Sequence, residues 1–225
     1  MTSTATGTAD SIRSIGILGA GRVGAALARR SVAAGYDVRI ATAKPAAEIS
    51  LLAEIVTPGA TPVDAAELAG TDLTIVAIPL RRYRDLDPAH FAGRAVVDVM
   101  NYWAPTDGEQ ADFEADHRTS SEIVQDHLSG SLLVKAFNHI GYHDLEADHR
   151  PAGAADRRAL AVAGDHEEVR GAVAGVIDRL GFDAVDAGPL AAGRALQPGT
   201  EIFNGSHSAA RLSMLLAEAC AVARV

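Results

Sequence analysis

Cysteine and aromatic residues are scarce in this sequence. One residue of 225, Cys220, is a cysteine, and 4% are aromatic. No disulfide can form within the chain, and the core must be mainly aliphatic. A lone cysteine in an Ala-rich segment is typical of a small buried hydrophobic residue rather than of a reactive thiol. A reducing compartment suits such a chain, so we expect a cytoplasmic protein.

Long basic runs and long apolar runs are also lacking. The net charge is −9, and no segment supplies the basic face that nucleic-acid phosphates require. No apolar stretch is long enough to span a bilayer. Residues 1–11 are rich in Thr, Ser and Ala and lack the features of a signal peptide, so we predict a disordered tail there. We therefore expect neither a nucleic-acid partner nor a membrane association.

Strand and helix patterns alternate along the rest of the chain, which indicates a parallel sheet with crossover helices. We predict an α/β fold: a Rossmann-type, doubly wound, mostly parallel sheet over residues 12–190, extended by two or three strands and followed by a C-terminal helical extension at 191–225. The predicted strands are 12–18, 36–41, 61–63, 73–78, 95–99, 132–137, 160–163 and 182–185. The predicted helices are 22–34, 46–54, 120–128, 165–180 and 206–223, with a polar loop at 101–118 and an irregular segment at 144–157.

A glycine-rich loop joins the first predicted strand to the first helix. Gly19 is expected to make the tight turn, Gly21 to let a pyrophosphate approach the backbone, and Gly24 to let helix and strand pack closely. The amides at the start of the helix favour an anion. A glycine-rich turn without a ligand is the alternative, but the strand–loop–helix context favours dinucleotide binding. The predicted phosphate-binding residues are Gly19, Ala20, Gly21, Arg22, Val23 and Gly24.

The end of the second strand indicates which dinucleotide binds. NAD-binding domains place a carboxylate there for the ribose 2′-hydroxyl, whereas this strand ends without one and Asp37 stands at its start. A hydroxyl and an ammonium can bind a 2′-phosphate instead. We therefore predict NADP(H) as the cofactor, with Thr42 and Lys44 as 2′-phosphate ligands and Arg22 as a candidate third. The alternative is that Lys44 is only a solvated loop charge.

Several segments together resemble a known family. They are GILGAGRVG at 16–24, VAIP at 76–79, LVKAFNHI at 133–140, AVAGD at 161–165 and LGFDAVDAGPL at 180–190. The chain resembles, from Ile12 to about Gly193, the NADPH-dependent oxidoreductases of the coenzyme F420 reductase type, which share their domain with the cytosolic reductase domain of the STEAP metalloreductases. It departs from them at Thr42-Ala43, where the family usually has Ser-Arg, and at Pro198-Gly199, which breaks a helix in the acceptor region.

The resemblance implies further site residues at the carboxyl ends of the strands. Ile78 and Pro79 are expected to line the dinucleotide groove, and Ala136, Phe137 and Asn138 to border the nicotinamide. Ligands bind at these strand ends in α/β sheets, and Asn101 after the fifth strand is a further predicted cofactor residue. We predict Asn138 and His139 as the catalytic residues that orient the nicotinamide. A turn-capping role for Asn138 is the alternative.

Two groups of side chains remain open to more than one interpretation. Tyr102 and Trp103 follow the fifth strand, where they could stack on a flat acceptor ring, cover the loop or contact a second subunit. The run Arg81–Arg84 could reach a cofactor phosphate but is more typical of a solvated helix face. The eight histidines show no ligand spacing, because Gly141 separates His139 from His143, so we predict no metal site.

We therefore predict an NADP(H)-dependent oxidoreductase that transfers hydride between NADPH and a flat redox acceptor, either the deazaflavin coenzyme F420 or a flavin. The only partner expected besides a second copy in a homodimer is this small molecule. One alternative is an NADP(H)-binding redox sensor without turnover. Another is the β-hydroxyacid dehydrogenase or imine reductase class, whose members carry a long helical second domain. About 35 residues follow Pro189, too few for that domain.

Overall fold

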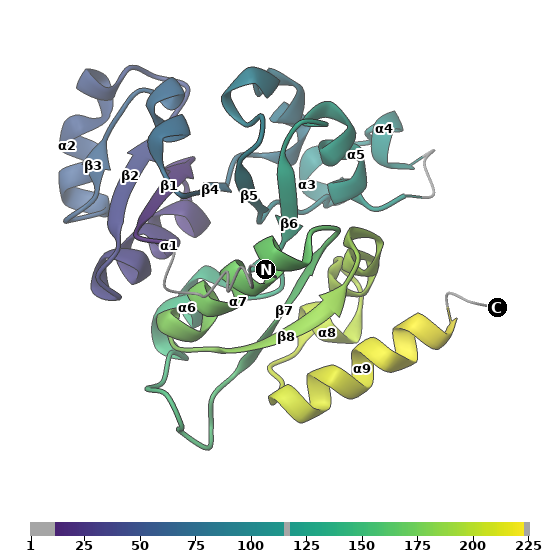
Figure 1. Cartoon of the computed structure of the whole chain (residues 1–225). Coiled ribbons are helices and arrows are strands. Elements are labelled where there is room, and N and C mark those ends of the chain that lie inside the picture. The colour runs from purple at the N-terminus through teal and green to yellow at the C-terminus, as the bar shows by residue number, and fades with distance from the viewer. Residues whose placement is uncertain (1–11, 115–117, 223–225) are drawn as a thin grey trace, which may run out of the picture.

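A computed structural model describes residues 12–114 and 118–222, so the predicted tail at 1–11 lies outside the described residues. Eight strands form one sheet in the order β3-β2-β1-β4-β5-β6-β7-β8 (Figure 1). The strands are β1 (Ser14–Leu18), β2 (Asp37–Ala41), β3 (Thr61–Pro62), β4 (Leu73–Val76), β5 (Ala95–Asp98), β6 (Leu132–Lys135), β7 (Ala159–Gly164) and β8 (Asp183–Gly188).

The first six strands pair in parallel, in the doubly wound order that reverses between β1 and β4. β7 runs antiparallel to β6, and β8 is parallel to β7. The predicted Rossmann-type, mostly parallel sheet is confirmed, with two added strands at the β6 edge. The reversal point lies where the glycine-rich loop follows β1.

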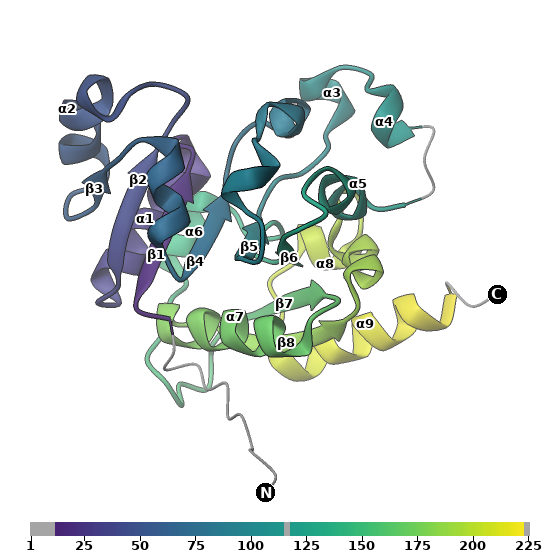
Figure 2. The same ribbon diagram turned by 45° about the horizontal axis from the view of Figure 1, so that its top comes forward.

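Helices cover both faces of the sheet. The main helices are α1 (Arg22–Ala33), α2 (Ala46–Val56), α5 (Ser120–His127), α6 (Tyr142–Ala147), α7 (Glu167–Leu180) and α9 (Ala209–Val222). α1, α6 and α7 cover one face, and α5 with the 3-10 helices η2 (Ala65–Gly70), η3 (Leu80–Asp85) and η4 (Pro88–His90) covers the other. α9 lies over β7 and β8, apart from α2 at the opposite edge (Figures 1 and 2).

Alternate residues of each strand pack on opposite faces, and the central strand β4 is therefore buried along its whole length. Ile15 and Ile17 of β1 face α1, whereas Leu18 packs with the second core cluster on the other face. In β7, Leu160 belongs to the α7 face, and Ala161 packs with the C-terminal helices. The core is therefore continuous across the parallel strands and the two added ones.

Local sequence signals set several helix ends. Thr119 and Glu122 form a reciprocal capping box at the start of α5, with the Thr119 N–H donating to the Glu122 carboxylate over 2.7 Å. Gly181 ends α7 in the left-handed conformation, at a φ of 103°. Both ends agree with the predicted helices within two residues.

Two segments differ from the expectation of irregular chain. The predicted loop at 101–118 contains two short helices, α3 (Ala104–Asp107) and α4 (Ala111–Glu114), and α3 begins with Pro105 in its first turn. The segment at 144–157 was also expected to be irregular, but α6 extends into it as far as Ala147. The reason is tertiary: the Arg158 guanidinium binds Asp144 and Asp148, so these acidic residues hold α6 in place.

The C-terminal segment packs on the sheet extension. The 3-10 helix η5 (Leu190–Leu196), the short helix α8 (Glu201–Asn204) and α9 contribute Leu196, Ile202, Leu212 and Leu215 to one cluster with β7. Among the described residues, no helix combines the length and apolar character that a bilayer span requires.

Candidate dinucleotide site

The glycine-rich loop has the geometry that its three glycines predict. Gly19 has a φ of 119°, which favours glycine, and its N–H donates to the carbonyl of Ala41 over 2.8 Å. A methyl group on Gly24 would overlap the carbonyl oxygen of Gly19, so this glycine lets α1 start against β1. A methyl group on Gly21 would meet no atom of the described residues within 4 Å. Gly21 therefore leaves open space above the loop.

The first turn of α1 is available to an anion. Gly21 is its N-cap residue, and neither a capping side chain nor an acidic residue in the first turn occupies it within the described part of the chain. Val23 is half-buried against the core. The Arg22 guanidinium carbon lies 5.6 Å from the ring centroid of Tyr142 in α6. Arg22 thus turns toward α6, where it lines a second cavity, and not toward Thr42.

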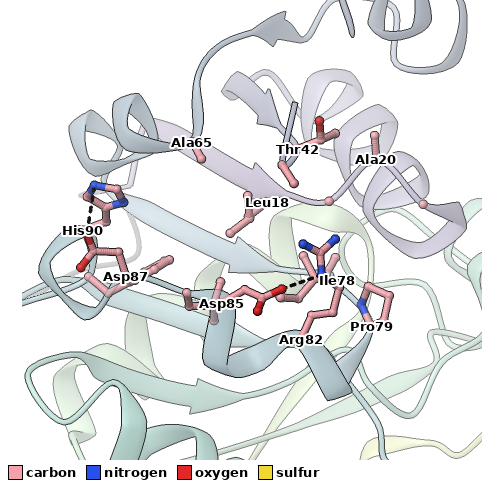
Figure 3. A pocket seen from close by; sticks show the side chains of 16 residues that line it. Leu18, Ala20, Thr42, Ala65, Ile78, Pro79, Arg82, Asp85, Asp87 and His90 are labelled. Carbon is pink, nitrogen blue, oxygen red and sulfur yellow. Dashed lines mark hydrogen bonds and ion pairs between the residues drawn. The ribbon is translucent and has the colours of Figure 1, made fainter. Parts of the chain in front are cut away.

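A cavity of about 360 Å³ opens beside the loop, at the carboxyl ends of β1, β2 and β4 (Figure 3). A pocket of this size can bury the adenosine half of a dinucleotide. Its lining is mostly apolar, with charged side chains of η3 and the start of η4 at its edge. The lining residues are Leu18, Gly19, Ala20, Gly21, Thr42, Ala43, Ala65, Ala77, Ile78, Pro79, Arg82, Asp85, Leu86, Asp87, His90 and Phe91.

The two predicted 2′-phosphate ligands are placed differently. Thr42 lines the cavity, and its hydroxyl oxygen accepts a 3.0 Å hydrogen bond from the backbone N–H of Lys44. The Lys44 side chain is 69% exposed, and its ammonium lies 3.8 Å from the Glu48 carboxylate. Lys44 is therefore outside the cavity wall, on a flexible stem next to it.

Arg82 is a cation of the cavity wall that the sequence did not single out within its basic run. It faces Thr42 from the opposite side of the cavity, and its Nε donates to the Asp85 carboxylate over 2.7 Å (Figure 3). Both side chains are about half exposed, at 49% and 59%. Such a surface ion pair is worth at most about 1 kcal/mol, so Arg82 can exchange Asp85 for a phosphate at little cost.

A buried ion pair, which was not predicted from the sequence, joins the ends of β5 and β6. The Lys135 ammonium of β6 donates to the Asp98 carboxylate of β5 over 3.2 Å and to the Met100 carbonyl. Asp98 also accepts from the Ser121 hydroxyl and the Met100 N–H. Burial lowers the pKa of Lys135, and the Asp98 carboxylate opposes that shift. The signal was two charged residues at the ends of adjacent apolar strands.

The residues predicted to border the nicotinamide are buried. Ala136 and Phe137 have no exposed surface, and Phe137 has a φ of 59°, which is uncommon for a residue other than glycine. Asn138 is 5% exposed, and its amide nitrogen donates to the Asn101 side chain and to the Leu196 carbonyl. His139 is 3% exposed. Their roles toward a cofactor stay predictions; Asn138 joins the residues that follow β5 and β6 to η5.

The acceptor-side aromatic residues lie in the segment with α3 and α4. The Trp103 side chain is 47% exposed. The Tyr102 hydroxyl donates to Glu114, and its ring centroid lies 5.2 Å from that of Phe113. Tyr102 therefore anchors the segment, while Trp103 leaves a large apolar face in solvent.

No group of three or more His, Cys, Asp or Glu side chains in residues 12–114 and 118–222 is arranged to hold a metal ion.

Comparisons with known proteins match this geometry. Residues 14–102, which run from β1 through the glycine-rich loop to Tyr102, match the family model described as NADP oxidoreductase, coenzyme F420-dependent. The chain is also 29% identical over 188 residues to the Metalloreductase STEAP3 of Rattus norvegicus. That alignment covers 81% of this chain but 35% of the relative, so the chain spans about a third of that protein.

Two solved structures are similar over most of the chain. A hypothetical protein, SMa0349, from Sinorhizobium meliloti is 30% identical with a TM-score of 0.76, covering 88% of this chain and 96% of that one. A putative F420-dependent NADP-reductase from Arthrobacter sp. FB24 has a TM-score of 0.69 at 21% identity, covering 82% and 88%, and supports the fold. Over residues 14–102 the chain is thus similar to the family of coenzyme F420-dependent NADP oxidoreductases.

Proposed function

We propose that this protein transfers hydride between NADPH and a flat redox acceptor, either the deazaflavin coenzyme F420 or a flavin. The observation that carries the proposal is the open space above Gly21 beside a cavity that contains Thr42 and Arg82 and has no carboxylate at the end of β2. A pyrophosphate would lie on the loop, and adenosine with its 2′-phosphate would occupy the cavity.

Hydride transfer requires that two flat rings be aligned and water excluded, more than it requires an acid–base residue. The cofactor, once bound over β2 and β1, extends past β4 toward the ends of β5 and β6. There Trp103 offers its exposed face to an acceptor ring. The ion pair of Asp98 and Lys135 holds the backbone at Met100 and so fixes where that segment begins.

Acceptor-dependent loss of NADPH absorbance tests the proposal. We expect the wild-type protein to oxidise NADPH with one of four acceptors: coenzyme F420, FMN, FAD or a quinone. We expect the Gly21→Ala variant to oxidise NADPH with none of them. Binding of NADPH without turnover in the presence of all four acceptors would favour the redox-sensor alternative. Absence of NADPH binding would contradict both functions.

A further inference from the structure

A network of side-chain hydrogen bonds joins the residues that follow β5 and β6 to the middle of β7 and to η5. The Ala161 N–H in β7 donates to His139 Nε2 over 3.0 Å, and His139 Nδ1 lies 3.2 Å from Asn138 Oδ1. Asn138 Nδ2 reaches Asn101 Oδ1 at 3.0 Å and the Leu196 carbonyl at 2.6 Å. Asn101 Nδ2 donates in return to the Asn138 carbonyl over 2.8 Å.

The direction of each hydrogen bond in this network follows from one group that can only donate, the backbone N–H of Ala161. A backbone N–H can only donate, so His139 Nε2 carries no proton and Nδ1 carries it instead. Nδ1 therefore donates to Asn138 Oδ1, which leaves the Asn138 amide nitrogen with two protons for its two acceptors. Both amide protons of Asn138 are thus used within the protein, so Asn138 has no free donor, and its carboxamide cannot rotate by 180° without breaking these bonds.

Asn101 differs from the other two residues in exposure and in unused hydrogen-bonding capacity. Asn138 and His139 are 5% and 3% exposed, whereas Asn101 is half-buried. Asn101 uses one amide proton and one lone pair on Asn138, so among the described residues one proton and one lone pair of its carboxamide have no partner. It follows β5, the strand next to β4, whose end lines the cavity.

We propose that Asn101 binds the carboxamide of the nicotinamide, and that Asn138 and His139 are positioning residues that hold the Asn101 side chain. This inference rests on the proposed NADP(H) function. A primary amide needs both a donor and an acceptor from its site, and Asn101 retains one of each. The bonds from Asn138 hold its side chain in one orientation before the cofactor arrives, which lowers the entropic cost of binding.

A cofactor analogue isolates this contact without any turnover. In 3-acetylpyridine adenine dinucleotide phosphate, a methyl group replaces the amide nitrogen of the carboxamide and removes its N–H donors. We expect the wild-type protein to bind NADP⁺ about three- to tenfold more tightly than the analogue, the range for one neutral hydrogen bond. In Asn101→Ala this preference should fall to nearly one, and Asn204→Ala, a surface amide bonded to Thr200, should retain it.

The positioning residues are tested by the same ratio. His139→Gln lacks a donor next to Asn138 Oδ1 and should lose most of the preference, whereas His139→Asn places an amide N–H near the Nδ1 position and should restore it. An unchanged ratio in Asn101→Ala would overturn the inference while the proposed function stands. A wild-type protein that binds neither nucleotide in titration calorimetry would overturn the proposed function and the inference with it.

Discussion

Gly21 and Gly24 of the phosphate loop differ in the atoms that an added methyl group would meet. Alanine substitutions at these two positions therefore form a matched pair of variants. A Cβ atom at position 21 meets only open space, so Gly21→Ala should leave the fold intact and block the pyrophosphate. A Cβ atom at position 24 overlaps the Gly19 carbonyl, so Gly24→Ala should destabilise the protein itself. Circular dichroism melting and NADPH titration separate the two effects. Normal NADPH binding by a folded Gly21→Ala variant would show that the loop is only a turn.

Cofactor choice is also decided by single side chains around Thr42. Lys44→Ala should weaken NADPH more than NADH, by on the order of 2 kcal/mol for one charge-assisted phosphate contact. Arg82→Ala should act in the same direction, because Arg82 lines the cavity that Lys44 only adjoins. Arg84→Ala is the control, since that guanidinium is bound to Asp112 outside the cavity wall. Equal losses for both nucleotides in calorimetry would remove these residues from the 2′-phosphate site.

The low pKa of the buried His139 predicts how the free energy of unfolding depends on pH. Burial first, and then the positive charges of Arg158, Lys135 and His207, lower the pKa of His139 to about 3. The unfolded chain binds this proton below a pH of about 6.5, so the free energy of unfolding falls as the pH drops from 6.5 toward 3. One proton contributes up to about 1.4 kcal/mol per pH unit.

His139→Asn should therefore flatten the pH profile in that window, whatever its own cost in stability. Urea unfolding between pH 4 and pH 7 measures both slopes. Equal slopes for the variant and the wild-type protein would mean that His139 is protonated in the folded state.

At the scale of elements, the segment with α3 and α4 tests the acceptor side. Trp103→Ala should raise the acceptor KM several-fold, since a stacking contact is worth about 1 kcal/mol, and should leave the NADPH dissociation constant unchanged. Because the side chain is 47% exposed, the melting temperature should change little. A lower melting temperature with unaltered kinetics would assign Trp103 to covering the segment instead.

At the scale of the whole molecule, α9 is part of the core of the sheet extension. Leu212 has no exposed surface and packs in the cluster with β7, so Leu212→Ala should lower the free energy of unfolding by about 2–5 kcal/mol. Met214 on the same helix is 53% exposed, and Met214→Ala should change it by less than about 0.5 kcal/mol. Denaturant unfolding measures both, and similar costs would contradict the packing of α9 on β7.

The sequence alone determined the positions of the strands along the chain, the class of fold (a mostly parallel, doubly wound sheet) and the glycine-rich loop. These features depend on local patterns: apolar runs bounded by turns, and glycines whose spacing follows from one loop geometry. Thr42 was predicted because it follows a strand that ends without a carboxylate, at the edge of the sheet where ligands bind, and it lines the cavity there. The helices within 101–114 were not predicted, since a hydrogen bond, an ion pair and a ring contact with Tyr83 and Arg84 stabilise them.

Only the tertiary structure decided which side chains meet at the site. It placed Arg82 in the cavity and Arg22 against α6. In the sequence both are arginines that follow a strand end, and no local pattern shows which of them faces the cavity. It also joined Asn101, Asn138 and His139 to one another across three strands. The physical reason is that hydrogen bonds and burial between residues far apart in the chain depend on how its elements pack, which no local pattern records.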